Sequence, residues 1–272
     1  DLLSKEKRAV SKLQEKKGIS MDSSLKILLA EDNAINRKLA KALLQKKGWS
    51  VVTVMDGKEA LERLKIESFD LILMDVQMPV MDGYIATNKI RQKEASKGGH
   101  IPIIAMTAHA MKGDREKCME AGMDDYVSKP MKAEELYSAI QRSMNGKLRP
   151  ADASDRASCE VDLTIAMDAV DGDEELLKEL VNDFLEEIPR QLEELHGVID
   201  RGDAGQVERK AHSLKGNVGL FGAKAAYDLV YDLENRGREN HLTGAAEVYE
   251  KLEQEITRLR AFFSKPEWMR CA

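Results

Sequence analysis

Short apolar runs alternate with amphipathic stretches from about residue 25 to residue 145. The apolar runs predict five buried strands, at 25–30, 51–54, 70–74, 101–106 and, more briefly, 126–127. The amphipathic stretches predict helices near 34–48, 57–67, 83–96, 110–121 and 131–144. Strands that alternate with helices in this way predict an α/β fold, a five-stranded parallel sheet with helices on both faces.

The strand pattern ends before residue 147, and the rest of the chain is helical in character. Helices are predicted near 162–170, 173–199, 203–220, 223–237 and 243–263. Four main amphipathic helices joined by short turns predict an antiparallel four-helix bundle. Pro189 lies inside the longest helix and predicts a bend, because its ring removes one backbone hydrogen bond.

These patterns divide the 272 residues into two domains of ordinary size. The predicted parts are a connector or tail at 1–22, an α/β domain at 23–146, a linker at 147–159, a helical domain at 160–265 and a tail at 266–272. The chain starts at Asp1 and not at Met, so we expect a fragment of a longer protein.

Composition narrows the class of protein. Cys118, Cys159 and Cys271 are odd in number and widely spaced, which predicts reduced thiols in a cytoplasmic protein. The longest apolar runs have about five or six residues, against the roughly 20 that span a bilayer, so this segment is predicted to make no membrane contact. Basic residues are scattered, which argues against nucleic-acid binding.

The net charge of −6 is unevenly distributed. Residues 1–150 carry 27 basic and 21 acidic side chains, a balance of +6, whereas residues 151–272 carry 15 and 27, a balance of −12. Two unrelated surfaces would explain this difference. Electrostatic attraction between the halves would explain it too, and it would weaken as salt is added.

Polar residues with complementary chemistry end the predicted strands. Glu31 and Asp32 follow the first strand, Asp75 the third, Thr107 the fourth and Lys129 the fifth. Ligands of parallel α/β sheets collect at the carboxyl ends of the strands. An aspartate that accepts a phosphoryl group needs a divalent cation, a positive side chain and a hydroxyl around it, and three carboxylates form an oxygen site suited to Mg²⁺.

The same residues stand in five motifs that resemble a response-regulator receiver domain over about residues 25–145. The motifs are Glu31-Asp32, Asp75-Val-Gln-Met-Pro-Val-Met-Asp-Gly83, Met106-Thr107-Ala108, Asp124-Asp-Tyr-Val-Ser and Lys129-Pro130. The resemblance implies a flavodoxin-like fold with Asp75 as phosphoacceptor. It also implies that Mg²⁺ is held by Asp75, by Asp32, by Glu31 through a bound water and by the backbone carbonyl of Gln77.

The resemblance assigns the remaining site residues as well. Thr107 and Tyr126 match the family's switch pair, in which the hydroxyl moves toward the phosphate and the ring turns inward. Lys129 would contact the phosphoryl oxygens, and its bond to Pro130 is expected to be cis. His109 is expected to lie at the surface, near the entrance of the site.

A second candidate site centres on His212, in the acidic helical half. A buried stripe is predicted at helical spacing, formed by Val207, Ala211, Leu214, Val218 and Phe221. His212 lies off this stripe and is expected to be exposed, beside Lys215 and Gly216. Gly216 and Gly219 predict room for an approaching partner, since a glycine inside a helix costs roughly 1 kcal/mol relative to Ala. Lys215 is placed to offset phosphate charge, or is an ordinary solvated lysine.

Residues 158–265 resemble a histidine phosphotransfer (HPt) domain. The resemblance rests on Ala211-His-Ser-Leu-Lys-Gly-Asn217, on Phe221-Gly-Ala223, on Leu233-Glu234 and on the stretch from Val161 to Pro189. It implies that His212 accepts a phosphoryl group. Asn217 departs from the small residue frequent at its position, which bears on the surface around the phosphoryl group.

Together the two resemblances predict a phosphorelay module, as in the C-terminal part of a hybrid sensor histidine kinase. The expected route runs from an upstream kinase histidine to Asp75, then to His212, then to a downstream response regulator. No P-loop or ATP lid is found, so the segment itself is not expected to consume ATP. We expect this segment to lie in the cytoplasm. The sequence leaves open whether the full-length protein is anchored in a membrane.

Two other functions would use some of the same residues. In an interaction switch, phosphorylation of Asp75 would only rearrange the domains, and His212 would serve a different partner. An aspartyl phosphatase of the haloacid dehalogenase type would need a second aspartate two residues after the nucleophile. Gln77 occupies that position, so the sequence argues against the phosphatase.

Overall fold

The structure is a computed structural model that describes residues 24–107, 112–145, 162–265 and 268–271. His109 and the predicted linker at 147–159 lie outside the described residues. No helix within these ranges is long and apolar enough to cross a membrane.

The first half is built on a parallel sheet of five strands in the order β2-β1-β3-β4-β5. The strands are β1 (Lys26–Ala30), β2 (Ser50–Val54), β3 (Leu71–Asp75), β4 (Ile103–Thr107) and β5 (Asp125–Ser128). The helices are α2 (Ala34–Lys46), α3 (Gly57–Ile66), α4 (Gly83–Lys97), α5 (Lys112–Glu120) and α6 (Ala133–Asn145). Each predicted strand and helix is present, and the flavodoxin-like fold is confirmed.

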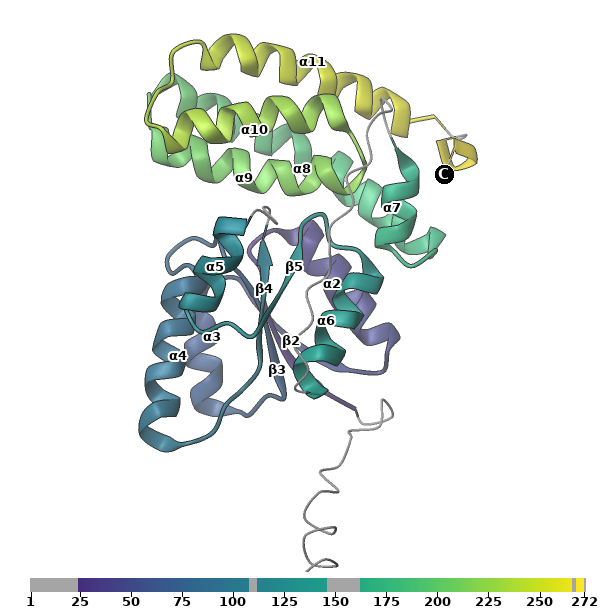
Figure 1. Cartoon of the computed structure of the whole chain (residues 1–272). Helices are drawn as coiled ribbons and strands as arrows, with labels where there is room; N and C mark the ends of the chain where they lie inside the picture. Colours follow the sequence, from purple (N-terminus) through teal and green to yellow (C-terminus); the bar gives the residue numbers. More distant parts are fainter. Residues whose placement is uncertain (1–23, 108–111, 146–161, 266–267, 272) are drawn as a thin grey trace, which may run out of the picture.

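Helices cover both faces of the sheet, as the buried strands require (Figure 1). Alternate strand residues such as Leu29 and Leu73 belong to the cluster that includes α2 and α6. Their neighbours Leu28 and Ile72 pack on the other face with residues of α3 and α4. This alternation explains the continuous apolar runs in the sequence.

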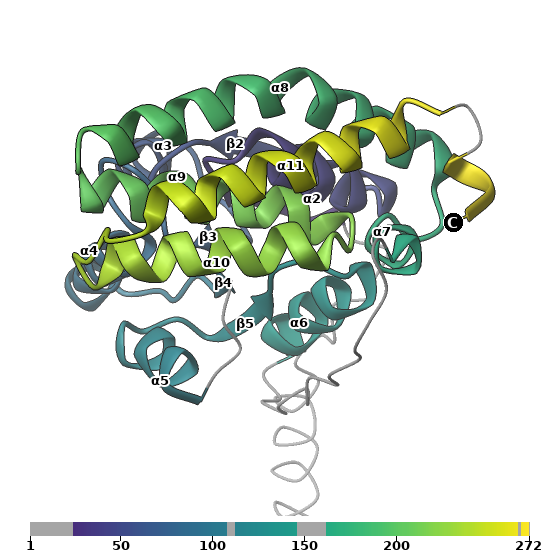
Figure 2. The same cartoon turned by 90° about the horizontal axis from the view of Figure 1, so that it is seen from above.

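The second half contains helices only within the part of the chain that is described. They are α7 (Leu163–Ala169), α8 (Glu174–Asp200), α9 (Ala204–Leu220), α10 (Lys224–Arg238), α11 (Ala245–Phe263) and a short 3-10 turn, η1 (Trp268–Cys271). Helices α8 to α11 each pack on the next, and α11 returns to α8, which completes a four-helix bundle (Figure 2). The helix α8 continues through Pro189, and the predicted bend stays a prediction.

The bundle lies over the carboxyl ends of the strands, where the candidate residues of the sheet are found (Figure 1). Helix α2 makes the main connection, because it contacts both α8 and α9. One buried apolar cluster includes residues from α2 and α6 and from the bundle. The two halves are therefore packed against each other, with the strand ends facing α9.

Replacing Gly237 by Ala should destabilise the bundle. An added Cβ would lie 2.4 Å from the backbone nitrogen of Glu208 and 2.8 Å from the carbonyl oxygen of Ala204, and backbone atoms cannot move aside cheaply. We expect a loss of about 1–3 kcal/mol in the free energy of unfolding, measured by urea denaturation. Gly197→Ala is the matched control. Its Cβ would meet only the flexible Arg201 side chain, so this variant should be neutral or more stable by up to about 1 kcal/mol. Equal losses in both variants would contradict the close α9–α10 packing.

Candidate functional site

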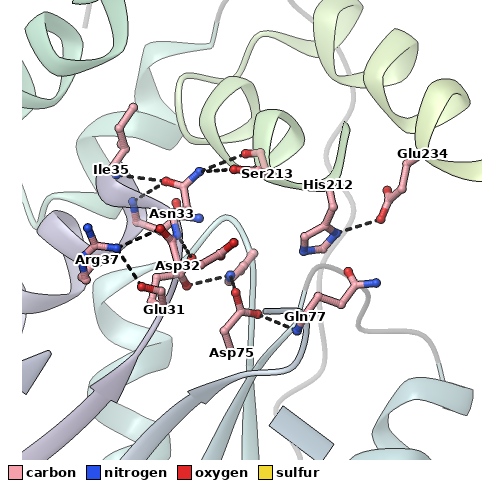
Figure 3. A network of polar contacts seen from close by, with 12 residues as sticks. Glu31, Asp32, Asn33, Ile35, Arg37, Asp75, Gln77, His212, Ser213 and Glu234 are labelled. Carbon is pink, nitrogen blue, oxygen red and sulfur yellow. Dashed lines mark hydrogen bonds and ion pairs between the residues drawn. The ribbon is translucent and has the colours of Figure 1, made fainter. Parts of the chain in front are cut away.

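Three carboxylates meet where β1 and β3 end. Glu31, Asp32 and Asp75 each offer an oxygen within 4.8 Å of the others. Asp75 is the last residue of β3, and its side chain is almost completely buried. Arg37 donates from its Nη1 to the backbone carbonyls of Glu31 and Asp32, at 2.9 Å each, and so fixes the loop that carries two of the three (Figure 3).

Lys129 supplies the positive charge of this site. Its Nζ lies 2.7 Å from Asp75 Oδ2 and 2.7 Å from Glu31 Oε2. Burial lowers the pKa of Lys129, but the two carboxylates outweigh burial and raise it above its usual value. The bond from Lys129 to Pro130 is cis, as expected.

The acidic cluster carries more negative charge than Lys129 balances. Burial raises the pKa of Asp75 well above its ordinary value, and the charge of Glu31 raises it further. Burial and Glu31 also raise the pKa of Asp32 to about 6. Glu31 Oε2 is buried and, apart from the ion pair with Lys129, has no hydrogen-bond partner. Three carboxylates face a single ammonium here, and one of their buried oxygens lacks a hydrogen bond. Such a site fits a hard divalent cation such as Mg²⁺.

The remaining predicted residues of the first site lie around this cluster. Thr107 ends β4 and is buried, and Tyr126 is half-buried on β5 with the Arg115 guanidinium 5.8 Å from its ring centre. The backbone N–H of Gln77 donates to Asp75 Oδ1 at 3.2 Å. The switch roles of Thr107 and Tyr126, and the ligand role of the Gln77 carbonyl, stay predictions.

His212 lies on α9 and is held by Glu234 of α10. The Nδ1 atom of His212 is 2.8 Å from Glu234 Oε1 (Figure 3). Because a carboxylate only accepts, we assign the proton of neutral His212 to Nδ1, which leaves the lone pair of Nε2 free to attack. Burial lowers the pKa of His212 below its usual 6.5, against the opposing effect of Glu234, so the ring is neutral at pH 7.

Glu234 belongs to the Leu233-Glu234 motif of the HPt resemblance, but the sequence did not assign it to His212 as a partner. It is fully buried and also pairs with Lys215 Nζ and with Arg238 Nη2, the latter at 3.1 Å. Burial raises its pKa, but the hydrogen bond from His212 and the surrounding positive charge bring it down to about 2. The motif gave the residue but not the contact, because Glu234 reaches His212 from another helix, α10.

Two expectations for this half need correction. His212 was expected to be exposed, but its side chain is only 11% exposed because the first half covers it. Lys215 was expected either to be an ordinary solvated lysine or to offset phosphate charge. The solvated position is wrong, and the phosphate role stays a prediction. Lys215 is 1% exposed and its ammonium pairs with Glu234, since a buried cation requires a nearby anion.

The two sites open into one small cavity. It is lined by side chains from both halves, among them Glu31, Asp32, Asp75, Lys129, His212 and Lys215. Figure 3 shows the ring of His212 pointing from α9 toward the strand ends that carry Asp75 and Gln77. The acidic site and the histidine are therefore placed opposite each other within one chain.

The room predicted at Gly216 is filled by the first half of the chain, whereas the room at Gly219 is filled mainly by the second half itself. A Cβ on Gly216 would lie 2.8 Å from Asn36 Nδ2. One on Gly219 would lie 3.2 Å from the ring of Tyr227 on α10 and 3.9 Å from Pro130 Cδ. Asn33 adds a direct link. Its Oδ1 caps α2 by accepting from Ile35 and Asn36, and its Nδ2 donates to the carbonyl and hydroxyl of Ser213, at 3.0 and 3.2 Å.

Glu234→Gln should change how stability depends on pH. A carboxyl whose pKa falls from 4.5 to about 2 on folding contributes stability above pH 4.5, and this contribution is lost as the pH falls toward 2. At pH 7 the variant leaves Lys215 buried without its anion, at a cost of about 3–5 kcal/mol. Urea denaturation at several pH values should therefore show a difference from the wild type that shrinks below pH 4.5. A difference that is constant from pH 7 to pH 3 would contradict an ionised Glu234.

An α/β domain with an acidic strand-end site, followed by a bundle with a helix-borne histidine, defines a two-component phosphotransfer protein. Family models agree with this class: residues 27–141 match the response regulator receiver domain, and residues 179–262 match the Hpt domain. The chain is thus a receiver domain followed by an Hpt domain.

Its curated relatives include histidine kinases. The signal transduction histidine-protein kinase BarA of Escherichia coli is 32% identical over 247 residues, 87% of this chain and 26% of BarA. Hybrid signal transduction histidine kinase I of Dictyostelium discoideum is 53% identical over 120 residues, 42% of this chain and 7% of that kinase. The chain spans only a small part of either relative.

Among solved structures, the receiver domain of the Pseudomonas aeruginosa sensor histidine kinase PA1611 is similar to the first half. It is 44% identical, covers 45% of this chain and 99% of its own, and has a TM-score of 0.42.

Proposed function

We propose that Asp75 accepts a phosphoryl group and passes it to His212 within the same chain. The observation that carries this proposal is the shared cavity, in which the acidic cluster and the histidine face each other. A phosphorelay needs the two acceptors to come within reach of one phosphorus atom. An interaction switch, in which Asp75 and His212 serve different partners, would not require them to meet.

In the first step the Asp75 carboxylate attacks the phosphorus of a phosphohistidine on an upstream kinase domain. The phosphorus–nitrogen bond of the donor breaks as the new phosphorus–oxygen bond forms. Lys129 is close enough to Asp75 to neutralise charge on the transferred group, and Thr107 offers a hydroxyl beside the same strand ends. Mg²⁺ would be held by Asp32, Asp75, the Gln77 carbonyl and, through a bound water, Glu31, and would neutralise further phosphoryl charge.

In the second step Nε2 of His212 attacks the phosphorus, and the Asp75 oxygen leaves as a carboxylate. The ring becomes positively charged when Nε2 forms its new bond, and the buried carboxylate of Glu234 stabilises this charge through Nδ1–H. Because His212 is neutral before the step, it needs no base to remove a proton.

The partners follow from this route. The donor is a histidine kinase domain, which the full-length protein itself would supply if it resembles its hybrid-kinase relatives. The acceptor is the receiver domain of a separate response regulator in the cytoplasm. Because the first half covers His212, the two halves must separate before that regulator can reach it.

Asp75→Asn tests the proposed order of transfer. The whole chain is incubated with acetyl phosphate and Mg²⁺, and acyl phosphate is told from phosphohistidine by its lability in alkali. Wild-type protein should form both, and the variant should form neither, because His212 depends on Asp75 for its phosphoryl group. Phosphohistidine in the Asp75→Asn chain would show that His212 is loaded independently and would favour the interaction switch.

A further inference from the structure

Ion pairs between the two halves lie along α2, outside the phosphoryl site. Lys38 Nζ is 2.7 Å from Asp183 Oδ2 and 3.1 Å from Glu179 Oε2, and both carboxylates lie on one face of α8. At the end of α2, Lys46 Nζ is 3.0 Å from Asp171 Oδ2. In each pair the receiver half provides the cation and the Hpt half the anion.

This polarity repeats the charge balance of the sequence, +6 for residues 1–150 and −12 for residues 151–272. Of the two explanations for that imbalance, attraction between the halves is the one that these pairs illustrate. Lys38 differs from Lys46 because two carboxylates, one helical turn apart, converge on it. A single change at Lys38 therefore alters two cross-domain contacts at once.

The neutral contacts and the charged contacts have different roles. Asn33 and Asn36 fit α2 against Ser213 and Gly216, next to His212, and fix how closely the helices approach. These contacts use a backbone carbonyl, the Ser213 hydroxyl and a glycine, and none of these carries a charge that could oppose a wrong partner. Lys38, in contrast, pairs with charged side chains of α8. It can therefore discriminate between Hpt domains that carry different charges at these positions.

We propose that Lys38 is the specificity-determining residue of the transfer from Asp75 to His212, and that it selects this Hpt half through Glu179 and Asp183. The inference rests on the proposed function and goes beyond it. Partly exposed ion pairs add little affinity, but complementary charges set the register and the rate of docking, and like charges in the same place oppose it. With Glu at position 38, three carboxylates would face one another across the interface.

The test uses the full chain and compares Lys38→Glu with a matched control, Lys41→Glu. Lys41 is exposed on the same helix and no ion pair joins it to the Hpt half within the described ranges. Both variants change the net charge equally. Asp75 is loaded with acetyl phosphate and Mg²⁺, the donor is removed, and the appearance of alkali-stable phosphohistidine is timed.

Lys38→Glu should slow transfer by at least about tenfold, while Lys41→Glu should transfer at the wild-type rate. Added salt should narrow the difference, since it screens exposed charges. A third chain, Lys38→Glu with Glu179→Lys and Asp183→Lys, restores opposite charges and should recover transfer to within about threefold of the wild type.

Two results would overturn the assignment: equal rates for Lys38→Glu and Lys41→Glu, or no recovery in the charge-swapped chain. A misfolded variant would be recognised because its acyl phosphate at zero time would fall too, whereas Lys38 makes no contact with Asp75. The proposed function fails differently. If the proposed function is wrong, the wild-type chain itself loads Asp75 but forms no phosphohistidine. The proposed role of Lys38 would then be wrong as well.

Discussion

A chain with Gln in place of His212 should load Asp75 and form no phosphohistidine at all. Glutamine has no lone pair of comparable nucleophilicity, so the phosphoryl group has no second acceptor in the cavity. Loading itself should persist, because the acidic cluster and Lys129 are unchanged. After acetyl phosphate is removed, the acyl phosphate of the variant should decay only by hydrolysis, while that of the wild type should also decay by transfer.

His196→Gln is the matched control for this experiment. His196 lies on α8 in the same half, stacks on Tyr249 and lies away from the cavity. Its replacement should leave phosphohistidine formation unchanged. Alkali-stable phosphate in the His212→Gln chain would mean that another histidine is the acceptor, and the assignment of His212 would be wrong.

Lys129→Ala is expected to have the second large effect, a fall of about 100-fold or more in the rate at which Asp75 is loaded. Its ammonium contacts both Asp75 and Glu31, and without it the buried carboxylates repel one another and a phosphoryl donor. Lys129 also lowers the pKa of Asp75 against the effects of burial and of Glu31, so its loss disfavours the carboxylate form that attacks. Acyl phosphate formed in a timed pulse measures this rate.

Lys132→Ala serves as the control, because Lys132 lies three residues further along and its Nζ is 4.0 Å from Glu135, outside the acidic cluster. It should load Asp75 at the wild-type rate. If Lys129→Ala also loaded at that rate, then Lys129 would be a structural partner of the cluster and would have no part in phosphoryl transfer.

The fold was predictable from the sequence because its signals are local. Within the described residues, apolar runs and helical periodicity predicted each strand and α-helix to within a few residues, but not the 3-10 turn η1. Asn33, Asp56 and Asp82 cap the helices that follow β1, β2 and β3. The acidic cluster was predictable for a related reason. Parallel strands end at the same edge of a sheet, so residues far apart in sequence had to meet there.

The surroundings of His212 could not be predicted in the same way. Glu234 and Arg238 reach the site from α10. The spacing of residues along one helix does not reveal which residues of another helix lie beside it. The burial of Lys215 was missed for the same reason, since the carboxylate that pairs with its ammonium, Glu234, lies on another helix. Glycines in α9 did predict a close approach, but not that the approaching helix belongs to the same chain.

The measurement that tests the central claim most directly is a single-turnover time course on the whole chain. Asp75 is loaded with acetyl phosphate and Mg²⁺, the donor is removed, and acyl phosphate and phosphohistidine are followed at several protein concentrations. We predict that phosphohistidine rises as acyl phosphate falls, at a rate that does not depend on concentration, because the two acceptors share one cavity. Loss of acyl phosphate as inorganic phosphate alone, with no phosphohistidine at any concentration, would contradict the relay.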